Sequence, residues 1–196
     1  GDVDGDSFLD LAVANYRSDT VSVLLGDGAG GFGPKMDIAT DRFPVAVALG
    51  DVDGDSVLDL AVAHYFADSV SVWLGDGAGG FAPGTVVTTG QAPSDLVLRD
   101  LNGDSSLDLA VANADSDSVS VLLGDGSGGF GARTDIPSAS LSFRLVAGDV
   151  NGDTVPDLAV AGLDTVSVLL GDGEGGFGAK TEFPAGPGTV AMGDVN

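Results

Sequence analysis

Aspartate residues recur in this chain at a spacing that suits a divalent cation. The pattern D-x-[DN]-G-D-x-x-x-D occurs four times, and its copies begin at Asp2, Asp51, Asp100 and Asp149, each 49 residues after the one before. Alternate residues of a curling loop can point inward at one ion, and the glycine at position 4 lets the chain turn sharply. Such hard oxygen ligands in a flexible loop suit Ca²⁺ better than Mg²⁺, which demands octahedral geometry. We therefore expect about one Ca²⁺ in each complete repeat.

The predicted ligands are the side chains at loop positions 1, 3, 5 and 9 and the backbone carbonyl at position 7. They are Asp2, Asp4, Asp6, Phe8 and Asp10 in the first loop, Asp51, Asp53, Asp55, Val57 and Asp59 in the second, Asp100, Asn102, Asp104, Ser106 and Asp108 in the third, and Asp149, Asn151, Asp153, Val155 and Asp157 in the fourth. Asn102 and Asn151 lower the anionic ligand count from four to three. Those two sites are expected to bind the cation more weakly.

Two other calcium-binding motifs do not fit these loops. An EF-hand needs glycine at loop position 6 and glutamate at position 12, whereas here position 6 is serine or threonine and position 12 is valine. Nonapeptide calcium repeats iterate along the chain, whereas the segment Gly-Asp-Gly-x-Gly-Gly-Phe occurs once in each repeat. We interpret the aspartates of those segments as hairpin-turn residues rather than ligands. They are Asp27, Asp76, Asp125 and Asp172.

The charge of the chain agrees with a cation-binding protein. Of 196 residues, 28 are aspartate and two are glutamate, against seven lysine plus arginine, for a net charge of −23. A compact chain this acidic repels itself, so we expect the ion-free protein to be less stable than the ion-bound protein. A nucleic acid would meet an anionic surface, so we predict no nucleic-acid partner. The absence of cysteine excludes disulfides and thiolate metal sites.

The rest of the composition describes a folded, secreted protein. Hydrophobic residues make up 43% of the chain, which is too much for a disordered acidic tail. No apolar run approaches the roughly 18 residues that cross a bilayer, so we expect no direct membrane insertion. Cations can stabilise a secreted fold in place of disulfides. Extracellular calcium modules bind the ion with weak affinities, which suit a secreted chain. We therefore expect an extracellular or cell-surface location.

A repeat of 40 to 50 residues is typical of propellers, solenoids and arrays. We treat residues 1–196 as one propeller region with repeats at about 1–44, 45–94, 95–142 and 143–188, while 189–196 begins a fifth. Each repeat is predicted to hold four short strands, and no segment carries a helical stripe of useful length. In the second strand, Leu-Ala-Val-Ala, the large residues face one side and the alanines the other. Such faces can nest, which predicts an all-β propeller of four-stranded antiparallel blades.

The predicted chain holds four blades, and its two ends pose a closure problem. The first repeat lacks an innermost strand, whereas Thr189–Met192 would be a spare one. That strand could close a four-bladed ring, or it could complete a second chain in an eight-bladed homodimer formed by strand exchange. The chain could also be a slice of a longer array. Because an unpaired edge promotes aggregation, we expect the spare strand to be paired.

The motifs resemble the FG-GAP repeat over essentially the whole chain. Gly-Gly-Phe-Gly at Gly30–Gly33, Gly128–Gly131 and Gly175–Gly178 is followed by an apolar run and then by the acidic loop. The same arrangement is found in integrin α-subunit propellers and in bacterial surface proteins of the VCBS type. The resemblance implies a propeller with Ca²⁺ in the loop between the first and second strands and partners on the opposite face. Integrin-like propellers have seven repeats, and some relatives are lectins.

Antiparallel strand order places the loops between second and third strands, together with the blade crossings, at the end opposite the acidic loops. The repeats differ there, and aromatic and basic residues gather. These candidate ligand-binding residues are Tyr16, Arg17, Arg42, Phe43, His64, Tyr65 and Phe66. Such side chains serve protein interfaces and sugar platforms. We expect a calcium-stabilised adhesion or recognition module for a protein or carbohydrate ligand. The alternatives are a structural spacer or assembly unit of a larger surface protein, or a sugar-binding lectin.

Catalysis is not expected. With no cysteine and one histidine, His64, only one serine–histidine–aspartate set could form. That histidine occupies the position of Asn15 and Asn113 in the neighbouring repeats, which indicates a loop variation. Paired carboxylates for glycoside hydrolysis are numerous, but the acidic loops use most of them. We therefore predict a binding protein rather than an enzyme.

Overall fold

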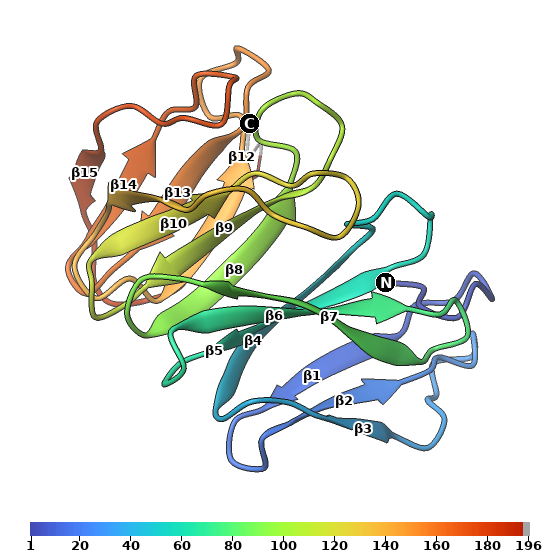
Figure 1. The fold of residues 1–196 in the computed structure, drawn as a ribbon. Coiled ribbons are helices and arrows are strands. Elements are labelled where there is room, and N and C mark those ends of the chain that lie inside the picture. The colour runs from blue at the N-terminus through green and yellow to red at the C-terminus, as the bar shows by residue number, and fades with distance from the viewer. Residues whose placement is uncertain (194–196) are drawn as a thin grey trace.

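The computed structural model describes residues 1–193, which form 15 strands in four antiparallel sheets (Figure 1). The first sheet holds β1 (Leu11–Asn15), β2 (Thr20–Leu24) and β3 (Met36–Ala39); the second holds β4 (Pro44–Gly50), β5 (Asp59–His64), β6 (Ser69–Gly75) and β7 (Phe81–Thr88); the third holds β8 (Pro93–Arg99), β9 (Asp108–Asn113), β10 (Ser118–Leu122) and β11 (Thr134–Pro137); the fourth holds β12 (Arg144–Gly148), β13 (Asp157–Ala161), β14 (Thr165–Leu169) and β15 (Thr181–Pro184). Within residues 1–193 no helix is long and apolar enough to cross a membrane.

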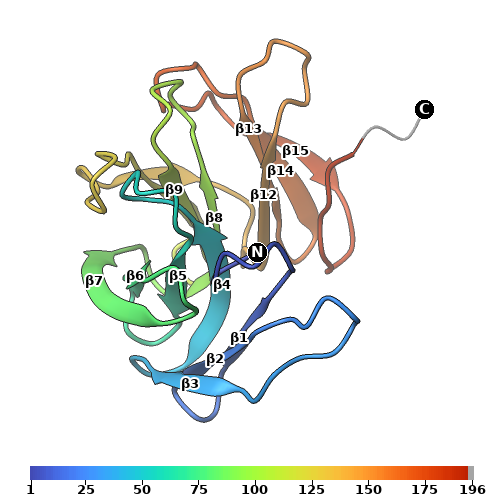
Figure 2. The same ribbon diagram turned by 90° about the vertical axis from the view of Figure 1, so that its right-hand side faces the viewer.

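Each sheet is an up-and-down meander, in which every strand pairs with the next strand of the chain. The strands β4, β8 and β12 lie innermost, and β1 lies beside β4. Figure 2 shows the four sheets following one another around an axis, with an opening between the last sheet and the first. These are the blades of a β-propeller whose ring this chain leaves open, so the predicted architecture is confirmed.

The prediction of a fourth innermost strand, at the start of a fifth repeat, is wrong. Thr189–Met192 forms no strand, and none follows β15 up to residue 193. A strand needs a neighbour that supplies a hydrogen-bond ladder, and none of the described strands pairs with this segment. The fifth copy of the acidic motif, Asp194–Asn196, lies outside the described residues.

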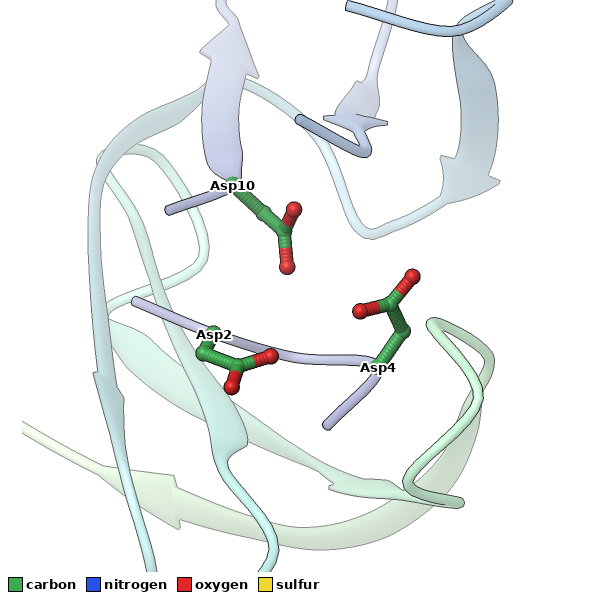
Figure 3. A group of neighbouring side chains, drawn as sticks. All are labelled: Asp2, Asp4 and Asp10. Atoms are coloured by element: carbon green, nitrogen blue, oxygen red, sulfur yellow. The ribbon is translucent and has the colours of Figure 1, made fainter. Parts of the chain in front are cut away.

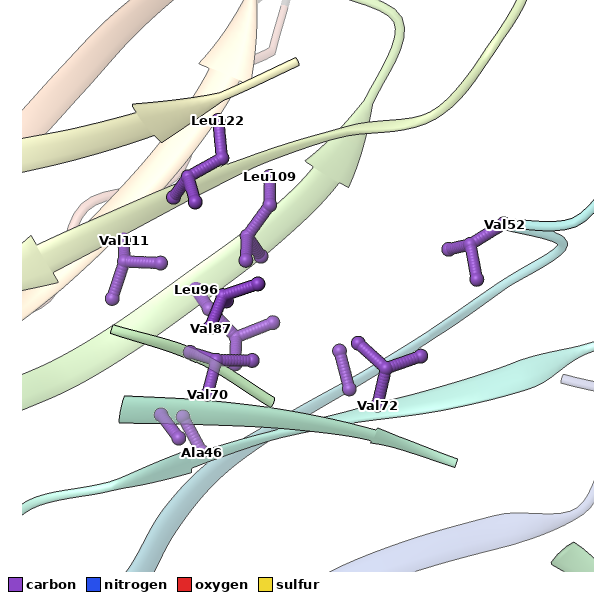
Figure 4. Packing of buried hydrophobic residues seen from close by; sticks show 11 residues of the cluster. Ala46, Val52, Val70, Val72, Val87, Leu96, Leu109, Val111 and Leu122 are labelled. Carbon is purple, nitrogen blue, oxygen red and sulfur yellow. The ribbon is translucent and has the colours of Figure 1, made fainter. Parts of the chain in front are cut away.

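The second strands nest as their composition predicts. The small side chains Ala61 and Ala63 of the second blade share one buried cluster with Leu109 and Val111 of the third blade. Figure 4 labels Leu109 and Val111 within this cluster. The same pairing of small and large faces recurs between the third and fourth blades and between the first and second. Burying each large side chain contributes roughly 2 kcal/mol. In β1 the large face has no preceding blade, and Leu11 is 45% exposed.

Candidate functional site

The last aspartate of each acidic motif is a buried structural residue. These residues, at the start of the second strands, are Asp10, Asp59, Asp108 and Asp157. In the third blade Asp108 Oδ2 accepts a hydrogen bond from the amide of Leu101, and Oδ1 accepts one from the amide of Gly124, both at 2.8 Å. The same two bonds recur in the other blades. One carboxylate therefore joins the acidic loop to the Gly-Asp-Gly turn of its own blade. The turn position requires glycine, because a Cβ on Gly124 would collide with the carbonyl of Leu107.

The first and fifth positions curl each loop around its own backbone. The two oxygens of Asp51 accept from the amides of Gly54 at 2.7 Å and Ser56 at 2.8 Å. Ser56 has φ of 72°, a left-handed conformation that non-glycine residues seldom adopt. Position 5 accepts from the amide of position 7, as in the 2.8 Å bond to Asp55. The residues at position 7, whose backbone carbonyls are predicted metal ligands, are thus held in place by hydrogen bonds from their own amides. They are Phe8, Val57, Ser106 and Val155.

In the first two loops the carboxylates of positions 1, 3 and 9 converge. One oxygen from each of Asp2, Asp4 and Asp10 lies within 4.8 Å of the others, and Figure 3 shows the three side chains around a common space. The second loop repeats the group with Asp51, Asp53 and Asp59. The predicted fifth-position ligands, Asp6 and Asp55, lie outside these groups.

Negative charge accumulates in the first loop. Partial desolvation raises the pKa of Asp4, and the charges of Asp6, Asp10 and Asp2 add to that rise, against a hydrogen bond from the Asp6 amide. In the second loop, burial raises the pKa of Asp59. Three hard oxygens that repel one another are a donor set suited to a calcium ion, which would neutralise them.

The third and fourth loops differ at position 3. The amide nitrogen of Asn102 donates to Asp104 at 2.9 Å, and that of Asn151 donates to Asp153 at 2.8 Å. Bonds from the Ser106 amide and from Asn102 lower the pKa of Asp104. Within residues 1–193, the acidic residues of these two loops form no converging group of three. In these two loops the asparagine at position 3 therefore donates a hydrogen bond to the carboxylate at position 5. In the first two loops position 3 is an aspartate, which cannot donate such a bond.

The carboxylates of the Gly-Asp-Gly turns bond to their own backbone. Asp125 Oδ1 accepts from the amides of Ser127 and Gly129, each at 2.9 Å, and these bonds lower the pKa of Asp125. The same pair of bonds occurs in the other three turns, at Asp27, Asp76 and Asp172. Each of these carboxylates therefore stabilises its own turn through backbone hydrogen bonds, as expected for a turn residue.

At the opposite end, four of the candidate ligand-binding residues form a continuous aromatic cluster. The ring centroids of Tyr16 and Phe43 are 4.9 Å apart, those of Phe43 and Phe66 4.6 Å, and those of Phe66 and Tyr65 5.0 Å. Tyr16 is 45% exposed and Phe66 62% exposed. Arg17 is exposed in the same connection as Tyr16, and Arg42 in the same connection as Phe43. We call Tyr16, Phe43, Tyr65 and Phe66 the aromatic cluster.

The aromatic cluster adjoins the open centre of the propeller. A cavity of about 640 Å³ lies there, and its lining includes Tyr16, Tyr65, Ser94, Arg144 and Thr189. Two members of the cluster therefore face this cavity as well as solvent.

The prediction that His64 belongs to the exposed ligand face is wrong. His64 is 1% exposed at the end of β5, and its Nε2 lies 2.8 Å from the hydroxyl of Ser71. That hydroxyl also accepts from Trp73 Nε1 at 3.1 Å. The equivalent Asn15 and Asn113 donate to Ser22 at 2.7 Å and to Ser120 at 2.9 Å, so this position belongs to a polar ladder inside the first three blades. Desolvation by burial lowers the pKa of His64.

The sequence reasoning missed a second recurring aspartate at the aromatic end. Asp68 Oδ1 accepts a hydrogen bond from the amide of Ala92 at 2.9 Å, which fixes the crossing into the next blade. The same bond joins Asp19 to Phe43 and Asp117 to Leu141. The signal was available, because these aspartates repeat at the same 49-residue spacing as the acidic loops.

Comparison with known proteins agrees with this geometry. A family model described as FG-GAP-like repeat matches residues 2–62, 51–111 and 100–160. A search of curated proteins found no match.

Three solved structures with a TM-score of 0.64 share the fold. A lectin from Agrocybe aegerita, described as recognising non-reducing terminal N-acetylglucosamine, is 22% identical over 92% of this chain and 50% of its own. BBS1N in complex with ARL6DN is 12% identical over 94% and 55%. A protein of unknown function from Desulfotomaculum acetoxidans is 15% identical over 89% and 56%. This chain therefore spans about half the length of the structures that it resembles.

Proposed function

The chain belongs to the family of FG-GAP-like repeat proteins, and we propose that it is a calcium-stabilised, extracellular or cell-surface recognition module. In this proposal the acidic loops hold the structure, and the aromatic cluster at the other end binds a protein or carbohydrate ligand. The proposal assigns no catalysis to the chain. Its one histidine, His64, is buried in a ladder with Ser71.

Calcium is the cofactor that the first two loops fit. Asp2, Asp4 and Asp10 would hold it in the first loop, with Asp51, Asp53 and Asp59 in the second, because their oxygens already converge. A bound Ca²⁺ would supply positive charge to a site where carboxylates repel one another. Asp10 and Asp59 also hold the Gly-Asp-Gly turn. Cation binding would therefore be coupled to the stability of the blade.

The exposed aromatic cluster is the observation that carries the recognition role. Folded proteins bury large aromatic side chains, and a set of four in contact at one end is the kind of surface that binds a partner. Proteins of this fold bind both ligand classes by their descriptions, since one is a lectin and another is in complex with a protein. A purely structural spacer would give no reason for aromatic side chains to gather where the repeats differ.

The test is a glycan array together with a panel of purified extracellular proteins, probed with the calcium-loaded chain. Substituting Tyr65 and Phe66 together by alanine should weaken binding of the ligand found by about tenfold or more, since interface aromatics are frequent hot spots. Phe183→Ala is the matched control, because this phenylalanine is 53% exposed on the outer strand β15. Unchanged binding by the double variant, or equal loss in the control, would contradict a ligand site at the aromatic cluster.

A further inference from the structure

The first blade exposes a face that the other three blades bury. Leu11 and Val13 are 45% and 42% exposed, whereas their equivalents in β5, β9 and β13 are fully buried beside the preceding blade. Of the described strands, β1 pairs with β2 alone, so its other edge is free. A groove of about 320 Å³ follows that edge between β1 and β4, and its lining includes Ala12 and Leu49. In each of the other blades the innermost strand lies along this edge.

The fourth blade exposes the complementary face. Between the first two blades, the turn residue Gly79 packs against Leu25 of the preceding blade, and its amide donates to the carbonyl of Val3 at 3.2 Å. The fourth-blade equivalents of Leu25 and Val3 are Leu170 and Val150, and both are exposed. The two open sides of the ring are therefore the two halves of an ordinary contact between successive blades.

The segment after β15 lies where the innermost strand of a next blade would lie. A Cβ on Gly50, at the end of β4, would be 3.2 Å from the side chain of Leu98, in the innermost strand of the next blade. A Cβ on Gly148, at the end of β12, would be 2.9 Å from Sδ of Met192, which is the sequence equivalent of Leu98. Thr189–Met192 is thus seated against the fourth blade without a strand to pair with.

We propose that these two open faces bind each other in two copies of this chain, so that Thr189–Met192 of one copy adds a strand to β1 of the other. Strand addition to a free sheet edge supplies the hydrogen-bond ladder that neither segment has alone. In the second blade Leu49 pairs with Leu60. The same register places Met192 opposite Leu11 of the partner copy, and the composite blade contains β1, β2 and β3 of that copy.

The same docking covers the other exposed positions of both faces. Gly30 of the partner copy is the equivalent of Gly79, and nothing lies within 4 Å of a Cβ built on it. In the composite blade it contacts Leu170 and the carbonyl of Val150, as Gly79 contacts the first blade. The partner's Val13 then lies against the fourth blade, as its equivalents lie against the blades that precede them.

The occupant is a second copy because the contact continues one that this chain already makes three times, between each blade and the next. The chain also spans about half the length of the structures that it resembles, so two copies supply the length of one of them. The charge of −23 on each copy opposes association. Association should therefore strengthen in Ca²⁺ and at higher ionic strength, which screen that repulsion. This inference goes beyond the recognition role and needs no ligand at the aromatic cluster.

The mass of the full chain in saturating Ca²⁺, measured by analytical ultracentrifugation over a range of concentrations, tests the interface. The expected result is an assembly of two or more copies that dissociates on dilution to the 19.3 kDa monomer. Leu11→Asp puts a charge into the contact and should weaken association about tenfold or more without disturbing the monomer, where this side chain is exposed. Leu163→Asp, at an exposed leucine between β13 and β14, is the matched control and should have no effect. A monomer at every concentration, or an assembly that Leu11→Asp leaves intact, would overturn the inference.

Single cysteines test the register, because the native chain has none. Residues directly opposite on paired strands have Cβ atoms about 5 Å apart. Mild oxidation of a mixture of Leu11→Cys and Met192→Cys chains should therefore give a covalent dimer faster than either variant alone. Leu163→Cys mixed with Met192→Cys should stay unlinked. A double variant, Leu11→Cys with Met192→Cys, that cross-links within single chains would show that the ring closes on itself, and this too would overturn the inference.

Discussion

At the end with the acidic loops, all four repeats keep the aspartates of positions 1, 5 and 9, whereas at the aromatic end the same backbone connections carry different side chains. Asp108 and its three equivalents make the same two backbone hydrogen bonds in every blade. At the other end Asp68 and its equivalents keep the crossing in place, but the residue held there is Phe43, Ala92 or Leu141. A fixed hydrogen-bonded frame therefore allows surface variation without loss of the fold.

The comparison predicts that stability is concentrated at the acidic end, and Asp108→Ala should give the largest effect. The substitution leaves two amides, of Leu101 and Gly124, without their acceptor in a buried position. The expected loss is about 3 kcal/mol in the free energy of unfolding, measured by urea denaturation. The Tyr65/Phe66 double alanine variant should lose only about 1 kcal/mol, because its contacts are partly exposed. Equal losses at the two ends would break the comparison.

A smaller effect should separate the loops with aspartate at position 3 from those with asparagine. Asp53→Asn should weaken calcium binding at the second loop by about tenfold, since affinity follows the number of charged ligands. Asn102→Asp should strengthen the third loop by a similar factor, because it removes the amide that now bonds to Asp104. Calorimetric titration of the two variants beside the native chain measures both. Affinities that do not move in opposite directions would show that position 3 does not contact the ion.

The smallest effect concerns the polar ladder between the two ends. Burial lowers the pKa of His64 below its ordinary value of 6.5 and outweighs the nearby Asp41. The unfolded chain then binds this proton more readily, so stability is fully present above pH 6.5 and falls as the pH drops toward the folded pKa. His64→Asn, which copies Asn15 and Asn113, should remove this part of the pH dependence. The check is Tm between about pH 7.5 and pH 5 in saturating Ca²⁺. A difference between the two proteins that does not change with pH would contradict this role.

The blades could be predicted because their pattern repeats and depends on local contacts. Leu-Ala-Val-Ala indicates a strand that is apolar on both faces, and Ala61 and Leu109 of neighbouring blades do share one buried cluster. The strand at Thr189–Met192 could not be judged in this way, because a strand also depends on a partner elsewhere in the chain. Burial depends on neighbours too: Val52 is 3% exposed, whereas its equivalent Val150, with no following blade, is 48% exposed.

The candidate site was predictable in residue type but not in role. Ligating a cation and accepting backbone hydrogen bonds both require a carboxylate. The motif alone therefore could not show that Asp59 joins the acidic loop to the Gly-Asp-Gly turn, whereas Asp53 does not. His64 was placed in a loop because strand ends are poorly marked in sequence, and β5 includes it. The aromatic cluster was predictable because strand alternation assigns its connections to one end.

Thermal unfolding in Ca²⁺ and in chelator tests the central claim most directly. If the first two acidic loops bind calcium, Tm rises with Ca²⁺, and each occupied site adds about 2.7 kcal/mol when free Ca²⁺ is 100-fold above its Kd. Mg²⁺ at the same concentration should stabilise the chain less, and a variant with Asp4 and Asp53 both changed to alanine should lose most of the response to Ca²⁺. A Tm that is the same in Ca²⁺ and in chelator, with no heat of Ca²⁺ binding, would contradict the account.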